Sequence, residues 1–103
     1  MSEKYGDLAE YISRSARTKL IQILIDHLGS TRAVARKLRV SAKAVWNWTS
    51  TSSTHPSNYH LRGVLKLAIK IDRERVLEII EEDLLKHLTA LRQLKKSKNV
   101  GQA

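Results

Sequence analysis

The stretch from Ser30 to Thr49, STRAVARKLRVSAKAVWNWT, constrains the fold more than any other part of the chain. Small or apolar residues recur at helical spacing in two runs within it, and these residues are Val34, Ala35, Leu38, Ala44, Val45 and Trp48. Val40 lies between the two runs, where a tight turn would fit. The pattern predicts two short helices joined by a turn, with one apolar seam running through both. This is the arrangement of the DNA-binding helix-turn-helix.

The same residues resemble the helix-turn-helix of phage repressor and Cro-like transcription regulators. Its small or apolar positions are matched by Ala35, Leu38, Val40, Ala44, Val45 and Trp48. Arg39 departs from the family, which usually has Gly there, and a left-handed turn costs a non-Gly residue roughly 1 kcal/mol. Ser30 or Thr31 is expected to cap the first helix, and Ser41 the second. The resemblance implies that the second helix enters the major groove of DNA.

The distribution of charge favours a polyanionic partner. The 103 residues carry a formal net charge of +9, with a pI near 10.2. No acidic residue lies between Asp26 and Asp72, whereas bases and acids nearly balance in both flanks. Nearly the whole excess therefore lies on and just after the helix-turn-helix, as expected for a surface that faces phosphate. We expect double-stranded DNA as the partner, ahead of an anionic membrane.

If the second helix enters the major groove, helical geometry aims five residues at the bases: Ser41, Ala42, Lys43, Trp46 and Asn47. Among these, Lys43 suits guanine or a phosphate, Asn47 suits adenine, and Ala42 suits a thymine methyl group. Trp46 could meet a thymine methyl group or a sugar, or it could fold against the following loop. Contacts to the DNA backbone are expected from basic and hydroxyl side chains, namely Thr31, Arg32, Arg36, Lys37, Arg39, Thr49, Ser50 and Thr51.

Two helices are predicted before the motif and two after it. Residues 7–12 could form a short helix capped by Asp7, and residues 16–28 carry an apolar stripe that is preceded by Ser15 and ended by Gly29. Beyond the motif, the hydroxyl-rich stretch 49–58 is either a solvated linker or a second source of phosphate contacts.

Helical spacing resumes over residues 59–71. There the apolar residues Leu61, Val64, Leu65 and Ala68 are expected to face inward, and the basic residues Arg62, Lys66 and Lys70 to face outward.

A last helix is predicted over residues 72–96, with Asp72 as its N-cap. Its apolar stripe contains Leu77, Ile80, Leu84, Leu88 and Leu91. A helix of roughly 23 residues is longer than a small core needs, so a second copy of the same helix is the expected partner. The alternative is that this helix packs back onto its own domain. We expect a disordered tail at 97–103.

These elements predict an all-α fold, a small helical domain of five or so helices with a central helix-turn-helix and a long C-terminal helix. Residues 1–71 would form the DNA-binding domain and residues 72–96 a dimerisation helix. There is no cysteine, which excludes disulfides and thiolate metal sites. The start of the chain has no apolar run of signal-peptide type, so we expect a cytoplasmic, nucleoid-associated protein.

No nucleophile motif, pair of histidines at metal spacing or glycine-rich phosphate loop is present in the sequence. We therefore expect no enzyme activity, no catalytic residues, no cofactor and no metal. A chain of 103 residues is also too short for a separate effector-binding module, so we expect no small-molecule effector. The favoured function is a sequence-specific, homodimeric transcription regulator that reads an inverted repeat through residues 41–49. One alternative is an architectural or plasmid-partition DNA-binding protein. The other is a protein-interaction module that keeps the helix-turn-helix only as a scaffold.

Overall fold

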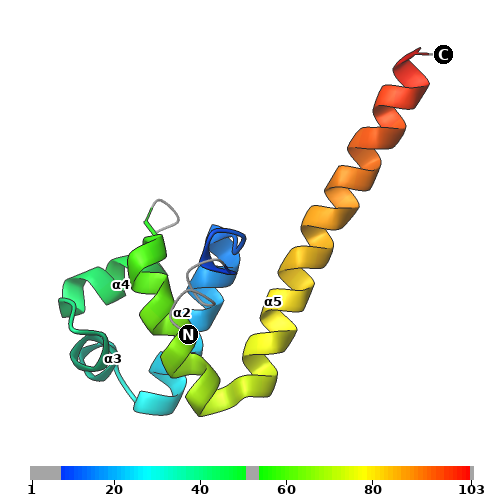
Figure 1. Cartoon of the computed structure of the whole chain (residues 1–103). Helices are drawn as coiled ribbons and strands as arrows, with labels where there is room; N and C mark the ends of the chain where they lie inside the picture. The colour runs from blue at the N-terminus through cyan, green and yellow to red at the C-terminus, as the bar shows by residue number, and fades with distance from the viewer. Residues whose placement is uncertain (1–7, 51–53, 103) are drawn as a thin grey trace.

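The computed structural model describes residues 8–50 and 54–102, and all regular secondary structure in these ranges is helical. It contains α2 (Arg14–Leu28), α3 (Thr31–Leu38), α4 (Ala42–Ser50) and α5 (Asn58–Gln102), as Figure 1 shows. The all-α prediction is confirmed. Four helices are found in this part of the chain rather than five or so. Of the short helix expected at 7–12, Leu8 and Ala9 are helical, and the Tyr11 N–H donates to the Leu8 carbonyl at 3.0 Å. Asp7 lies outside the described residues.

Helix α2 packs against both α3 and α4. Its N-cap is Ser13, whose hydroxyl oxygen accepts the Ala16 N–H at 3.2 Å, so the expected cap at Ser15 is wrong by two positions. It ends as expected at Gly29, whose φ of 95° lies in the left-handed region that glycine adopts at low cost. The stripe that faces the core includes Leu20, Ile21 and Leu24, all fully buried.

Helix α5 consists of two helical halves that meet at a kink at Asp72, where φ is −151° and ψ is 77°, values outside the helical region. The Asp72 carboxylate accepts the Arg75 N–H at 3.2 Å, so it caps the second half of the helix as expected. The two helices predicted at 59–71 and 72–96 are therefore the two halves of α5. In the first half, the four residues expected to face inward are all fully buried.

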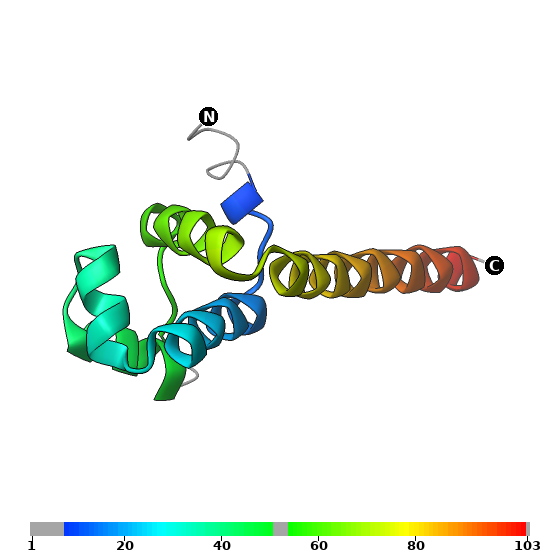
Figure 2. The ribbon, with the colours of Figure 1, turned by 90° about the horizontal axis from the view of Figure 1, so that it is seen from below.

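The second half of α5 begins on the domain and then leaves it. Val76, Ile79 and Ile80 belong to the same buried cluster as the residues of α2, α3 and α4. After Asp83, every residue up to Lys96 is exposed. Figures 1 and 2 show this part of the helix extending away from the other elements. It remains helical to Gln102, where we had expected a disordered tail from residue 97.

Residues 76–83 therefore dock onto the domain, in agreement with the back-packing alternative for that part of the helix. Ile80, expected at a dimer interface, is only 6% exposed and contributes to the chain's own core. The other four residues of the predicted dimer stripe retain between 41% and 50% exposure, and they are Leu77, Leu84, Leu88 and Leu91. We call these four residues the leucine ridge.

Candidate nucleic-acid interface

Helices α3 and α4 form a two-helix unit closed by a tight turn. Ser30 caps α3 by accepting the Ala33 N–H, and Ser41 caps α4 by accepting the Ala44 N–H, each at 3.1 Å. Between the helices, Arg39 adopts φ 58° and ψ 44°, the left-handed conformation expected where the family has Gly. The Val40 N–H donates to the Ala35 carbonyl at 3.0 Å and so satisfies an acceptor at the end of α3.

The two tryptophans of α4 lie on opposite faces, as predicted. Val45 is fully buried and Trp48 is 7% exposed, whereas Trp46 is 56% exposed. The Trp48 ring packs against the ring of His60, with ring centroids 5.7 Å apart. Burial of Trp48 fixes the rotation of α4 on the domain, because each residue turns about 100° from the one before. Lys43, Trp46 and Ser50 consequently face outward together.

The five candidate base contacts are not equally available. Lys43 and Trp46 are exposed, and Ser41 is exposed at the cap. Ala42 and Asn47 are half-buried at the two edges of the outward face. The Asn47 carbonyl also accepts the Thr54 hydroxyl at 2.7 Å, which ties the end of α4 to the following loop.

Among the candidate contacts to the DNA backbone, the basic side chains are more accessible than the hydroxyl side chains. Arg32, Arg36, Lys37 and Arg39 are all exposed, whereas Thr31 is half-buried. The hydroxyls of Thr49 and Ser50 donate to the Trp46 carbonyl at 3.1 and 2.7 Å. Each would have to rotate away from α4 before it could donate to a phosphate. Thr51 lies outside the described residues.

The positive charge of this surface has no acidic counterpart. Three ion pairs join described residues, namely His27–Asp72, Arg75–Glu78 and His87–Asp83. None of them involves a basic residue of α3, of α4 or of the turn between them. These basic side chains therefore remain available for an external anion.

Sequence reasoning missed a buried arginine that holds the scaffold together. Arg17, 7% exposed, donates to the carbonyls of Ala9 and Ile12 at 2.8 Å and to the carbonyl of Pro56 at 2.9 Å. A further bond of 2.8 Å goes to the Asn58 side chain. The pKa of Arg17 is lowered from its ordinary value, first because the side chain is buried and then because Arg14 is near. Asp83 acts in the opposite direction but does not reverse the shift. Arg17 thereby joins the N-terminal turn, α2 and the segment that leads into α5.

A buried carboxylate ties the second half of α5 to α2. Asp83 accepts the backbone N–H of Ser13 at 2.9 Å and also the Ser13 hydroxyl. Its other neighbour is His87, 3.6 Å away. Burial alone would raise the pKa of Asp83, but the hydrogen bonds from Ser13 and the nearby His87 outweigh that effect and lower it. No local sequence signal pairs residues 70 positions apart.

Comparison with family models, curated proteins and solved structures found no match. The resemblance to phage repressors therefore rests on the residues of the motif alone.

Two further properties bear on the site. Among the described helices, none is both long and apolar enough to cross a membrane. Residues 8–50 and 54–102 also contain no group of three or more His, Asp or Glu side chains placed to hold a metal ion.

Proposed function

We propose that this chain is a sequence-specific DNA-binding regulator that acts as a homodimer and places α4 in the major groove. The observation that carries the proposal is the outward face of α4. Burial of Val45 and Trp48 turns Lys43 and Trp46 outward, within a part of the chain that has no acidic residue. A helix face that carries a lysine, an exposed aromatic side chain and no acidic residue is suited to reading base edges.

Within the complex, the residues of α4 would have separate roles. Lys43 would donate to guanine or to a phosphate, and Asn47 at the edge of the face would make paired hydrogen bonds with adenine. Trp46, as an exposed aromatic side chain, would cover a thymine methyl group or a sugar. Ala42 is small enough to approach another methyl group, and Ser41 lies at the helix start, which is the end that contacts bases in this motif.

Phosphate contacts would position the protein without reading sequence. Arg32 and Arg36 are exposed on α3 and do not take part in an ion pair among the described residues. They are the strongest candidates for this role. Each neutralised phosphate releases counterions, so binding should weaken steeply with salt.

The leucine ridge supports the dimer. In a helix of 3.6 residues per turn, its four leucines lie about 100° around from the face that docks onto the domain. That docking therefore leaves the ridge exposed, and after Asp83 none of the other described elements covers residues 84–96. A two-fold pairing of this ridge with its copy would relate two α4 helices by symmetry. The target would then be an inverted repeat with half-sites about 34 Å apart, or a multiple of that distance.

Asn47→Ala tests base reading on duplexes that differ at single positions. If Asn47 reads adenine, binding should weaken by about 1–3 kcal/mol, and discrimination should be lost at one base pair only. Gln22→Ala is the matched control, because Gln22 is an exposed amide on α2. A loss that is uniform across all duplexes would contradict base reading by Asn47.

The salt dependence tests the phosphate contacts. Arg32→Gln should reduce the slope of log affinity against log salt by about one unit and leave sequence preference unchanged. A slope near zero for the unmodified chain would exclude nucleic acid as the partner.

Sedimentation of Leu88→Asp tests the dimer. The substitution places a charge on the leucine ridge and should give a monomer, whereas Gln93→Asp, on the opposite side of the helix, should not. Both positions are exposed in the single chain, so neither change disrupts its core. An unmodified protein that is monomeric at tens of micromolar and still binds one half-site tightly would refute the dimer and the inverted repeat.

A further inference from the structure

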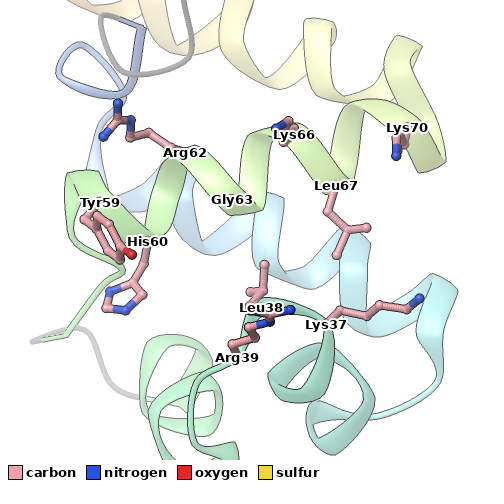
Figure 3. Close-up of a pocket in the computed structure, with 10 residues that line it drawn as sticks. All are labelled: Lys37, Leu38, Arg39, Tyr59, His60, Arg62, Gly63, Lys66, Leu67 and Lys70. Atoms are coloured by element: carbon pink, nitrogen blue, oxygen red, sulfur yellow. The ribbon is translucent and has the colours of Figure 1, made fainter. Parts of the chain in front are cut away.

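A basic groove with a volume of about 540 Å³ lies between the end of α3 and the first half of α5 (Figure 3). Its lining consists of Lys37, Leu38, Arg39, Tyr59, His60, Arg62, Gly63, Lys66, Leu67 and Lys70. We call it the α3–α5 groove. No residue of α4 lines it. The groove is therefore separate from the candidate base contacts, although Lys37 and Arg39 are also candidate contacts to the DNA backbone.

Cations occupy both walls of this groove. Lys37 and Arg39 come from the α3 side, and Arg62, Lys66 and Lys70 follow one another along α5. In Figure 3 the Arg62 side chain points away from Lys37 and Arg39, so Lys66 and Lys70 are the cations of α5 nearest to the α3 side. Successive members of the α5 row are separated by about 6 Å of helix, because four residues rise 1.5 Å each. None of the five cations forms an ion pair among the described residues. Like charges at this spacing repel each other, so an anion between the walls would be stabilised by both.

The remaining lining is apolar and aromatic. Leu38 and Leu67 face each other across the groove near Gly63. At one end, Tyr59 is 75% exposed, and its ring meets that of His60 edge-on at a centroid distance of 5.3 Å. An exposed aromatic side chain beside a row of cations provides a stacking surface and a phosphate-binding surface in one site.

We propose that the α3–α5 groove binds a nucleoside polyphosphate, with its base against Tyr59 and its phosphate chain between the rows of cations. The volume lies within the range of about 300–1,000 Å³ that is typical of small-ligand pockets. Five cations that form no ion pair among the described residues match a chain of several phosphates better than a neutral metabolite. The proposal is independent of the DNA-binding function. We had expected no small-molecule effector, because the chain is too short for a separate effector-binding module. The groove instead lies between two segments that no sequence motif connects.

Calorimetric titration of the full chain tests the proposal, with adenosine triphosphate as one probe and inorganic triphosphate as the other. Adenosine triphosphate should bind with one molecule per chain. Lys66→Glu should weaken that binding at least about tenfold, because it removes a charge-assisted hydrogen bond and adds a repulsive charge. Lys86→Glu is the matched control, because it changes net charge equally at an exposed site outside the groove, and it should change affinity less than about twofold.

Tyr59→Ala separates the nucleoside from the phosphate. It should weaken binding of adenosine triphosphate about fivefold or more and leave binding of inorganic triphosphate unchanged. Tyr59 and Lys66 are exposed, so both variants should retain the melting temperature of the unmodified chain. Equal weakening by Lys66→Glu and Lys86→Glu would overturn the site. Equal affinity for the two probes, unaffected by Tyr59→Ala, would overturn the nucleoside assignment.

The DNA interface needs its own control in this experiment. Asn47→Ala should leave nucleotide affinity unchanged, since Asn47 does not line the groove. Groove variants that alter duplex binding but not nucleotide binding would overturn the proposal and assign the groove to DNA.

Discussion

Replacement of Trp48 by alanine should destabilise the whole domain. Trp48 is 7% exposed, its ring packs against His60, and its carbonyl accepts the Thr18 hydroxyl of α2 at 3.3 Å. Truncation of a buried aromatic side chain costs about 3–5 kcal/mol through lost transfer energy and the cavity left behind. In a domain of this size, 1 kcal/mol shifts the melting temperature by roughly 4–8 °C. Trp48→Ala should therefore lower it by at least about 12 °C.

Trp46→Ala is the internal control, because it removes the same side chain from the exposed face of the same helix. Trp46 is 56% exposed, so its loss should change stability by no more than about 1 kcal/mol while weakening DNA binding. Thermal unfolding followed by circular dichroism measures both variants. An unchanged melting temperature for Trp48→Ala would refute the orientation of α4, and the assignment of its outward face would then be wrong.

Three other substitutions test the scaffold. Arg17→Met should destabilise the fold by about 3 kcal/mol or more in chemical denaturation, because three backbone carbonyls lose their donor, and a cost below about 1 kcal/mol would contradict the role of Arg17. The pKa of Asp83 is lowered in the folded state, so its contribution to stability is present above the ordinary value near 3.8 and is lost as pH falls below it. In Asp83→Asn the free energy of unfolding should therefore fall less steeply below about pH 4 than in the unmodified chain. An equally steep fall in both proteins would show that Asp83 contributes nothing to the acid sensitivity. Gly63→Ala should raise the free energy of unfolding by about 0.5–1 kcal/mol, because alanine loses less backbone freedom than glycine inside a helix. The added Cβ would lie 3.6 Å from a Leu38 methyl carbon, which is an ordinary contact. A lower melting temperature would show that α5 approaches α3 more tightly than that.

The parts of the fold that could be predicted depend on local chemistry. The caps at Ser30 and Ser41 and the left-handed turn at Arg39 each follow from a few consecutive residues. The opposite orientation of Trp46 and Trp48 follows from helical spacing in the same way. For the same reason the outward face of α4 could be outlined before the structure was known.

The parts that could not be predicted depend on residues far apart in the chain. Arg17 looks like one more surface cation in the sequence, and only the fold brings distant carbonyls around it. Ile80 belongs to the same apolar stripe as Leu84, and periodicity alone does not show that the domain ends between them. The contact of Asp83 with Ser13 marks that boundary, across 70 positions of sequence. The α3–α5 groove was missed because its walls come from separate segments.

Selection of bound fragments from a random pool of DNA duplexes tests the central claim most directly. The full chain should enrich an inverted repeat whose half-sites are separated by about 34 Å or a multiple of it, and footprinting should protect one compact palindrome. Selection with Asn47→Ala should give the same repeat with one base position relaxed in each half-site. Sequence reading by α4 would be contradicted if no sequence were enriched or if footprinting protected an extended array of sites. It would also be contradicted if Asn47→Ala and a Lys43→Ala, Trp46→Ala double variant both enriched the same sequence as the unmodified chain.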